Sequence, residues 1–469
     1  MGNLFGSIQN AVSSMLSYQQ VIEVIEHNVA NASTKGYRRQ EAILTPGVPT
    51  STARAGGNYV GQMGTGVRVD YIRQYNLAFI DAQIRSQLAE SSKWELSSNI
   101  LSQIEATFDE TGDDGLIPKL DAFWAGWQSL ADDPANMSLR INLIQVSADL
   151  ADAINNRVDT LNSIRQDQNN AILQSVDEIN SIATQVAKLN TEITKAIGID
   201  ESPNDLIDER DRLLEQLAEL TGGTVNIQEN GEALVTIGGH ALVVGSNAFE
   251  LTTTRDSNNL VQISWEADGR EFIPSSGKLA GLFEVRDVIV PEQLTGLKEL
   301  AETLTEEINE QHAEGYDLNG DEGDEFFVFS TSGDYYFNLK LSDNLDDPAH
   351  IAAASSQDSP GDGNNATIMA QLREALLMNG GASTFNNYYN SQITAFGLKV
   401  KEANTKSSDS SVVLSSLTEM RDSESGVSLD EEAGNLVSAQ KSYQACARVL
   451  TAIDEMLEVL INGTGLVGR

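Results

Sequence analysis

The residues of this chain that could carry chemistry are few and widely spaced. The four histidines are the side chains best suited to bind zinc or to exchange protons at neutral pH, and they stand at His27, His240, His312 and His350. None has a second histidine or a cysteine at the spacing of a zinc site. We therefore expect no metal site and no cofactor.

Two short motifs resemble ligand loops, and both depart from the pattern they resemble. Asp317, Asn319 and Asp321 match the first three ligands of a calcium loop, but Glu322 stands where that loop needs glycine. The glycines of residues 61–66 neither follow a predicted strand nor open a helix, as a phosphate-binding loop requires. We interpret the first motif as a solvated acidic turn and the second as a loop without a ligand.

The charged residues do not indicate catalysis or nucleic-acid binding. The chain holds 69 acidic and 30 basic residues, with a formal net charge of −39. No isolated carboxylate pair stands in an apolar setting, where the pKa shifts of acid–base catalysis arise. The basic residues are too scattered for a nucleic-acid footprint. We expect no catalytic residues and no enzyme.

The strongest pattern lies at the two chain ends, where apolar residues recur in steps of three and four. This spacing is typical of helices that pack lengthwise against other helices. The polar residues on the other faces exclude a membrane span. One interpretation is terminal helices that order only against neighbours; the other is ordinary core helices of one compact bundle. The two series are Leu4, Ile8, Ala11, Met15, Tyr18, Ile22, Ile25, Val29, and Leu436, Ala439, Tyr443, Cys446, Leu450, Ile453, Leu457, Leu460.

Charge also separates the ends from the middle. Residues 1–75 carry +2 and residues 426–469 carry −3, which leaves −38 of the total on the segment between them. A segment this acidic repels its own copies, nucleic acid and anionic membranes. Close packing between copies is therefore expected at the ends, with the middle facing water.

Length and cysteine content limit the architecture. A chain of 469 residues is expected to form several domains. The single cysteine, Cys446, excludes an intramolecular disulfide, and its position in the C-terminal series favours a small packed side chain over a reactive thiol. The first residues lack the basic start and apolar core of a secretory signal. We expect a cytoplasmic protein or one exported without a cleaved signal.

Periodicity predicts a helical chain with a β-rich insertion. Helices are expected at about 4–29, 75–111, 116–130, 134–196, 204–220, 291–312 and from 366 to the C-terminus, with breaks at 404–411 and 422–428. Strands are expected at 67–71, 234–237, 241–244, 261–265 and 336–341, and none in the polar, glycine-rich stretch before residue 66.

Several stretches resemble the axial proteins of the bacterial flagellum. Residues 28–40 (NVANASTKGYRRQ) and 64–73 resemble the signature that closes the first helix of rod, hook and hook-associated proteins and the strand after it, and residues 439–443 and 454–457 are similar to their C-terminal helix. Residues 425–432, 204–211, 315–320 and the pair Phe326-Phe327 resemble the hook-associated protein 1 (FlgK) family in particular. The resemblance spans essentially the whole chain.

This resemblance implies a structural protein that forms a ring at the junction between hook and filament. It implies export, unfolded, through the flagellum's own type III secretion channel to the outside of the cell. The implied partners are further copies of the chain, the hook protein, the next hook-associated protein, and an export chaperone that covers Tyr443, Leu450, Ile453 and Leu457. Nucleic acid and membrane are not expected as partners. A turn motif expected to shape a loop, not to bind a ligand, comprises Asn28, Asn31, Thr34, Gly36 and Tyr37.

We therefore predict a mainly α fold with an inserted β-rich domain (α+β), elongated and layered, with long coiled-coil-like terminal helices. Residues 1–75 and 426–469 form a terminal assembly domain, residues 76–221, 291–320 and 366–425 a helical bundle, and residues 222–290, with part of 321–365, a β-rich outer insert. The predicted assembly interface consists of Leu4, Ile8, Met15, Tyr18, Ile22, Ile25, Val29, Leu436, Tyr443, Cys446, Leu450, Ile453, Leu457 and Leu460.

Three alternatives stay open. Another flagellar axial protein, of the hook or distal rod, shares the terminal motifs but not residues 426–432. A secreted enzyme on a coiled-coil stalk requires a catalytic cluster within residues 222–365, and the sequence presents none. A cytoplasmic coiled-coil scaffold predicts terminal helices that are ordered in the isolated chain.

Overall fold

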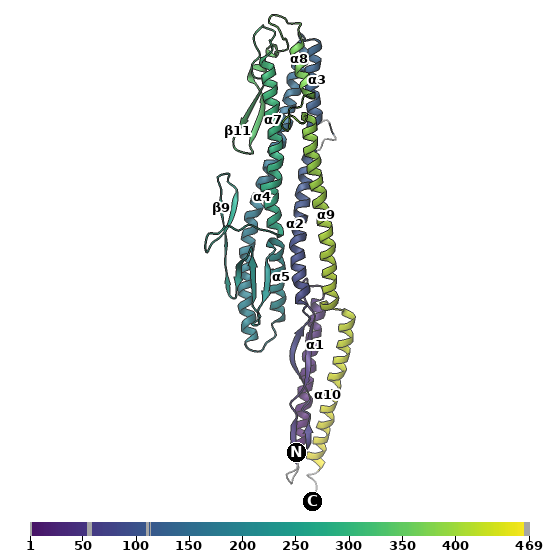
Figure 1. Ribbon diagram of the computed structural model, residues 1–469. Helices are drawn as coiled ribbons and strands as arrows, with labels where there is room; N and C mark the ends of the chain where they lie inside the picture. Colours follow the sequence, from purple (N-terminus) through teal and green to yellow (C-terminus); the bar gives the residue numbers. More distant parts are fainter. Residues whose placement is uncertain (1, 54–58, 109–111, 113, 464–469) are drawn as a thin grey trace. The chain divides into compact units, whose positions relative to one another are not determined.

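The computed structural model describes residues 2–53, 59–108, 112 and 114–463 (Figure 1). The chain folds into two compact units, each built from separate stretches of sequence. Unit 1 comprises residues 1–88, 179–250 and 412–469, and unit 2 comprises residues 89–178 and 251–411. Three long helices contribute residues to both units: α2 (Ala78–Thr107), α4 (Met137–Ile197) and α9 (Phe385–Ser425).

Unit 1 contains both ends of the chain as paired helices. Helices α1 (Gly2–Asn31) and α10 (Leu429–Gly463) lie side by side and run antiparallel (purple and yellow in Figure 1). Strands β1 (Gln40–Pro46) and β4 (Val67–Gln74) form an antiparallel pair that packs against α1. A smaller antiparallel pair is formed by β2 (Thr50–Ala53) and β3 (Tyr59–Met63).

The rest of unit 1 joins helix α5 (Asn204–Thr221) to a small sheet. Gly222, with φ +66°, ends α5 in the left-handed conformation that favours glycine. Asn190 of α4 fixes the first residue of the inner strand β6, because its side chain binds both N and O of Ala233 at 2.9 Å. The antiparallel strand order is β5 (Thr224–Ile227), β6 (Ala233–Ile237), β7 (His240–Val244), β8 (Asn247–Ala248).

Unit 2 is a helical bundle with two β-hairpins and one continuous hydrophobic core. Phe123, Trp124, Trp127, Phe326 and Phe327 pack ring against ring at its centre. Besides parts of α2, α4 and α9, the unit contains α3 (Leu116–Asp132), α6 (Gly277–Glu284), the π-helix η1 (Val285–Ile289), α7 (Val290–Ala313), α8 (Asn364–Gln371), the 3₁₀ turns η2 (Asp343–Asp346), η3 (Pro348–His350) and η4 (Leu372–Glu374), and the hairpins β9 (Leu251–Arg255) with β10 (Val261–Trp265) and β11 (Phe327–Thr331) with β12 (Phe337–Leu341).

Asparagines spaced seven residues apart on α4 bind the backbone of the hairpins. Asn155 binds O and N of Leu339 at 2.7 and 2.9 Å, and Asn162 donates to Tyr335 O at 2.9 Å. Asn169 accepts from Val261 N at 2.7 Å. An amide side chain offers both a donor and an acceptor; Asn155 uses both on the hairpin backbone, Asn162 its donor and Asn169 its acceptor.

A buried arginine holds the loop after β12 in place. Arg140 is 1% exposed and donates to the carbonyl oxygens of Pro134, Pro348, Ala349 and Ile351. Burial lowers the pKa of Arg140 to about 10, against an opposing effect of Asp317, so the guanidinium stays charged at neutral pH. Its partners are mainly backbone carbonyls, which makes it a structural cross-link between the start of α4 and residues 348–351.

The predicted fold class is confirmed: the chain is mainly helical, with small antiparallel sheets and a long C-terminal helix. The five predicted strands are all present, and so is the predicted break near residues 422–428. The predicted break at 404–411 is wrong, since α9 continues through it with Ala403 and Ser410 buried. The polar stretch before residue 66 contains three strands, and the helix predicted to start near 291 belongs to a helical run that begins at Gly277. No helix in the described part of the chain is long and apolar enough to span a bilayer.

Candidate functional site: the terminal helix pair and its joint

The two predicted apolar series face each other within one chain. Ile25 of α1 and Ile453 of α10 are each 5% exposed, and Ala11 and Ala439 are buried beside them. We call this contact line the seam. Of the other predicted interface residues, Val29 and Leu460 are exposed, and the side chain of Leu4 lies outside the described residues; the half-buried ones are Ile8, Met15, Tyr18, Ile22, Leu436, Tyr443, Cys446, Leu450 and Leu457. Their role in contacts between copies stays a prediction.

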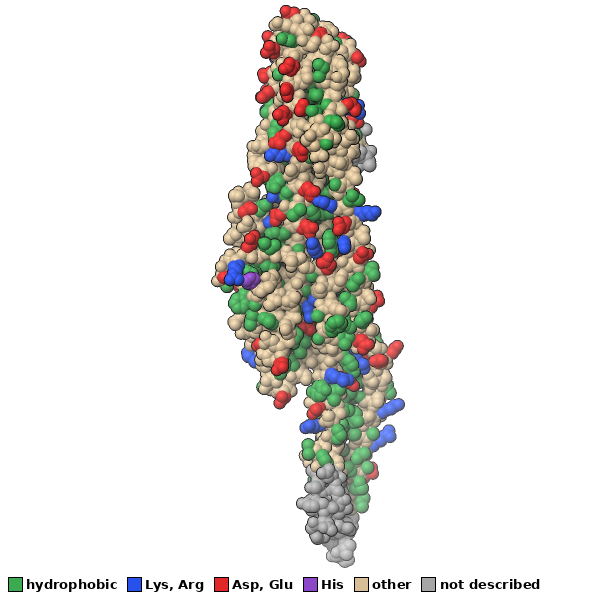
Figure 2. Space-filling view, in the orientation of Figure 1, with side chains coloured by type: hydrophobic (Ala, Val, Ile, Leu, Met, Phe, Trp, Pro, Cys, Tyr) green, Lys and Arg blue, Asp and Glu red, His purple; other side chains and the backbone are tan. Residues whose placement is uncertain are grey.

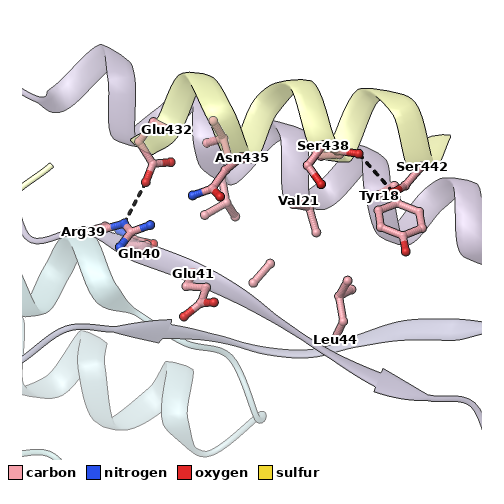
Figure 3. Close-up of a pocket in the computed structure, with 14 residues that line it drawn as sticks. Tyr18, Val21, Arg39, Gln40, Glu41, Leu44, Glu432, Asn435, Ser438 and Ser442 are labelled. Atoms are coloured by element: carbon pink, nitrogen blue, oxygen red, sulfur yellow. Dashed lines mark hydrogen bonds and ion pairs between the residues drawn. The ribbon is translucent and has the colours of Figure 1, made fainter. Parts of the chain in front are cut away.

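A groove of about 240 Å³ opens beside the seam, between α1, β1 and α10 (Figure 3). Val21 and Ile25 of α1 and Leu44 of β1 contribute apolar groups to it. Hydroxyl and amide groups of α10 line the opposite side, where Ser442 Oγ donates to Ser438 O at 3.0 Å. Arg39, Glu41 and Glu432 also line the groove, and Arg39 and Glu432 form an ion pair at 2.7 Å. We interpret the groove as a packing surface.

The predicted turn motif connects α1 to β1 through one fully buried side chain. Asn28 is 0% exposed; its Nδ2 donates to Gln40 O at 2.8 Å, and its Oδ1 accepts from Gln40 N at 3.0 Å and from the Tyr37 hydroxyl at 2.8 Å. Asn31 Nδ2 caps the helix end by donating to His27 O, and Asn31 Oδ1 accepts from Thr34 Oγ1. Gly36, with φ +84°, completes the reversal of the chain.

Arg38 lies at the centre of a buried ion cluster. Its guanidinium is within 2.6 Å of Asp211 and 3.0 Å of Asp81, while Asp208 lies at 3.5 Å and also accepts from the Arg38 backbone N at 3.2 Å. The arginine is 4% exposed and the three carboxylates are between 3% and 8% exposed. The cluster therefore ties the turn to the start of α2 and to α5.

The next two residues bind two further sets of elements. Arg39 Nε contacts Glu432 Oε1 of α10 at 2.7 Å, and Glu432, only 1% exposed, also accepts from Asn28 Nδ2 at 3.2 Å. Gln40 accepts from Asn204 Nδ2 at 3.1 Å and donates to Asp205 at 2.8 Å. We call Asn28 and residues 37–40, with these partners, the joint. It fixes α1, α10, α2 and α5 at one point.

The electrostatics of the joint are uneven. Burial raises the pKa of Asp208 to about 7, and the hydrogen bond from the Arg38 backbone only partly offsets this. Burial by itself lowers the pKa of Arg38, but Asp211 and Asp81 outweigh it, so the net shift is upward. Burial, with Asp205 and Asp208 nearby, also raises the pKa of Tyr37. Arg38 and Tyr37 therefore keep their protons, and Asp208 is the group that titrates near neutral pH.

The raised pKa of Asp208 predicts that the stability of unit 1 depends on pH. A carboxyl group whose pKa is higher in the folded state binds more protons there than in the unfolded chain between about pH 4 and pH 7. Its contribution to stability is therefore full at low pH and is lost as the pH rises through that window. We expect Asp208→Asn to make the fall in the free energy of unfolding less steep, by up to about 1 kcal/mol per pH unit. Amide hydrogen exchange in α5 at pH 5, 6 and 7 measures this, and equal slopes in both proteins would contradict it.

The faces of α1 and α10 that point away from the seam carry exposed apolar groups at helical spacing. On α1 they include Phe5, Val12 and Leu16, which are 63%, 39% and 58% exposed. Figure 2 shows hydrophobic side chains open to solvent among Lys and Arg side chains over the paired terminal helices. We call these faces the outer rows; they comprise Phe5, Gln9, Val12, Leu16, Glu23 on α1 and Val437, Lys441, Arg448, Ala452, Glu455, Met456, Val459 on α10.

The remaining polar groups serve the fold. His312 is buried, with Nδ1 against Asp324 O and Nε2 accepting from Ala352 N, and burial lowers its pKa to about 4. Asp317 accepts the backbone N–H groups of Asn319 and Asp321, so its carboxylate shapes the acidic turn. In the part of the chain that the structure describes, no three His, Cys, Asp or Glu side chains are placed to hold a metal ion.

Sequence reasoning did not assign the joint residues Arg38, Arg39, Asp208, Asp211 and Glu432. The only signal was indirect: all five fall in stretches that resemble family motifs, residues 28–40, 204–211 and 425–432. From sequence alone, charged side chains such as these are expected to be exposed to solvent. Only the packing of α2, α5 and α10 around the turn shows that they are buried.

Comparison with known proteins agrees with this architecture. Residues 101–327 match the family model of the flagellar hook-associated protein FlgK helical domain, and residues 421–463 match that of the flagellar basal body rod FlgEFG protein C-terminal region. A solved structure, that of the flagellar hook junction protein FlgK from Burkholderia pseudomallei, shares the fold with a TM-score of 0.64 at 17% identity, covering 74% of this chain and 100% of that one.

Two curated relatives align along their whole length. Flagellar hook-associated protein 1 of Bacillus subtilis is 28% identical over 509 residues, covering 100% of both chains. The protein of the same name from Escherichia coli is 27% identical, covering 97% of this chain and 99% of that one. The chain is therefore similar along its whole length to flagellar hook-associated protein 1, and it is a structural component of the bacterial flagellum, not an enzyme.

Proposed function

We propose that the chain forms the junction between hook and filament by assembling with its own copies through the terminal helices. The observation that carries this proposal is the pair of outer rows. A monomeric protein has little reason to keep Phe5, Leu16 and Val459 more than half exposed at helical spacing on its two terminal helices. Neighbouring copies around a shared axis cover these groups.

The joint supports the same proposal. An assembly that bears load between a hook and a filament needs its packed helices fixed to the rest of each subunit. Arg38, Arg39 and Gln40 bind α2, α5 and α10 within three consecutive residues, so the terminal helices are held by buried ionic and amide contacts. Such contacts have defined geometry, which favours one orientation of the helix pair.

The partners follow from this role. They are further copies of the chain, the hook protein on one side and the next hook-associated protein on the other. Before assembly, an export chaperone covers Tyr443, Leu450, Ile453 and Leu457 of α10, and the chain leaves the cell unfolded through the flagellar type III secretion channel. The division into terminal, bundle and outer-insert domains stays a prediction alongside these.

The test is the fate of hooks in cells that lack the gene. A deletion strain is expected to build hooks that carry no filament, and the restored gene to return filaments to them, as seen by electron microscopy of isolated hooks. Hooks with filaments in the deletion strain would contradict the junction role. Loss of the hook itself would favour the alternative of a hook or distal-rod protein.

A further inference from the structure

We propose that the outer row of α1 in one copy packs antiparallel against the outer row of α10 in the next copy, with Glu23 opposite Lys441 and Val12 opposite Ala452. This inference rests on the proposed function, because it requires copies assembled side by side with their terminal helices pointing the same way. Beyond that function, the inference specifies which faces of the terminal helices meet between copies and how the two helices are aligned along their length.

The charges of the two rows select this pairing. Residues 2–22 of α1 contain no charged side chain, and the first charges after them are Glu23 and Glu26, both exposed. The outer row of α10 carries Lys441 and Arg448, and no described residue lies within 4.0 Å of either as an ionic partner. At equal height, two α1 rows would bring Glu23 of both copies together, and two α10 rows would do the same for Lys441, Arg448 and Glu455. Pairing α1 with α10 can instead place Glu23 beside Lys441.

The spacing of the apolar groups sets the register. Within one chain Asn28 binds Glu432, so Glu23 lies level with Val437 and Phe5 lies level with Glu455 on the antiparallel helices. Two copies at the same height would therefore place each carboxylate against an apolar side chain. A shift of four residues along α10 instead places Glu23 opposite Lys441, Val12 opposite Ala452, and Phe5 opposite Val459. It also lays the aliphatic stem of Arg448 over Leu16.

The shift has a structural consequence. Four residues of α-helix correspond to about 6 Å along the axis. A contact between unlike faces is heterologous, and such contacts generate closed rings or open helices according to the step between copies. With this step, neighbouring copies rise by about one helical turn, so they form a helical layer and not a flat ring.

Paired cysteines test the register directly. In a background with Cys446→Ala, Val12→Cys is combined with Arg448→Cys, Ala452→Cys or Met456→Cys, three exposed positions one turn apart on α10. Hooks are isolated from cells that express each variant, oxidised, and resolved by non-reducing electrophoresis. We expect the 12/452 pair to give roughly tenfold more cross-linked multimers than the other two, because a disulfide needs Cα atoms within about 7 Å and one turn adds about 6 Å.

The outcomes separate the inference from the proposed function. If the chain is absent from isolated hooks in the reduced state, the proposed function fails. If the chain is present but the 12/448 or 12/456 pair gives the multimers, the assembly stands and the four-residue register is wrong. Cross-linking that stays within one chain, or none from any pair in assembled hooks, overturns the contact between the outer rows.

Discussion

Replacing Arg38 with methionine is expected to destabilise unit 1 by about 3–5 kcal/mol, since the change leaves three buried carboxylates without their shared cation. Asp81, Asp208 and Asp211 lie within 3.5 Å of the guanidinium and are almost inaccessible to water. Methionine fills much of the volume but supplies no charge. Asp211 keeps Arg210 at 3.3 Å and Asp81 keeps Arg421 at 4.0 Å, but Asp208 loses the ion pair that the described residues give it. The cost is therefore that of incompletely compensated buried charge and not of a cavity.

The distribution of tryptophan makes the effect measurable in the intact chain. All four tryptophans, Trp94, Trp124, Trp127 and Trp265, lie in unit 2. Tryptophan fluorescence during urea unfolding consequently reports unit 2 alone, and its midpoint is expected to stay unchanged. Amide hydrogen exchange in α5 reports unit 1, and protection there is expected to fall by roughly two to four powers of ten.

Arg68→Met is the matched control. Arg68 is also an arginine of unit 1 with an aspartate partner, Asp70 at 3.3 Å, but its side chain is 58% exposed. An exposed pair of this kind contributes about 0–1 kcal/mol, so protection in α5 should hardly change. If both substitutions lower protection equally, or if neither does, the buried cluster does not hold the joint together.

Most elements of the fold were predictable because their patterns are local. Each seam series repeats over about seven turns of helix, and residues 234–244 combine alternation with a Gly-Gly turn. The three strands before residue 66 were not predictable, because β1 contains Glu41 and ends at Pro46 and is stabilised by pairing with β4 and packing on α1. The Ser- and Asp-rich run after Ala403 led to the wrong prediction of a helix break, again because tertiary packing decides its structure. Packing along unit 2 keeps it helical against its weak propensity.

The site was predictable only in part. The turn motif was found through resemblance to a family, and the structure shows the physical reason for its side chains: Asn28 satisfies four partners at 0% exposure. The cluster around Arg38 depends on residues far apart in the sequence, from Asp81 to Asp211, whose charges suggest exposure. The outer rows were not seen, because Gln9, Lys441 and Arg448 interrupt their apolar residues. Only the three-dimensional pairing of α1 with α10 separates the rows from the seam.

Phe5→Asp is expected to abolish assembly without destabilising the isolated chain. Phe5 is 63% exposed on the outer row, and exposed substitutions of this kind usually change stability by less than about 0.5 kcal/mol. In the proposed contact Phe5 faces Val459, so the new carboxylate is buried against an apolar side chain without a hydrogen-bonding partner, at a cost of about 3 kcal/mol per contact. That cost lowers the association constant of each contact by roughly 150-fold, and it recurs at every copy. The fraction of hooks that carry filaments should fall to the level of the deletion strain.

Two further variants separate surface from seam. Leu450→Asp places a carboxylate in the half-buried seam, so it should abolish assembly and also weaken the pairing of α1 with α10 in the monomer, seen as lost amide protection in both helices. Val413→Asp changes a residue of α9 that is 47% exposed and outside the terminal helices, and it should leave filaments and stability unaltered. Normal filaments with Phe5→Asp would remove the outer row from the interface and leave the seam as the only contact surface. Assembly lost with Phe5→Asp while its monomer keeps full protection assigns the contact between copies to the face that a single chain leaves open.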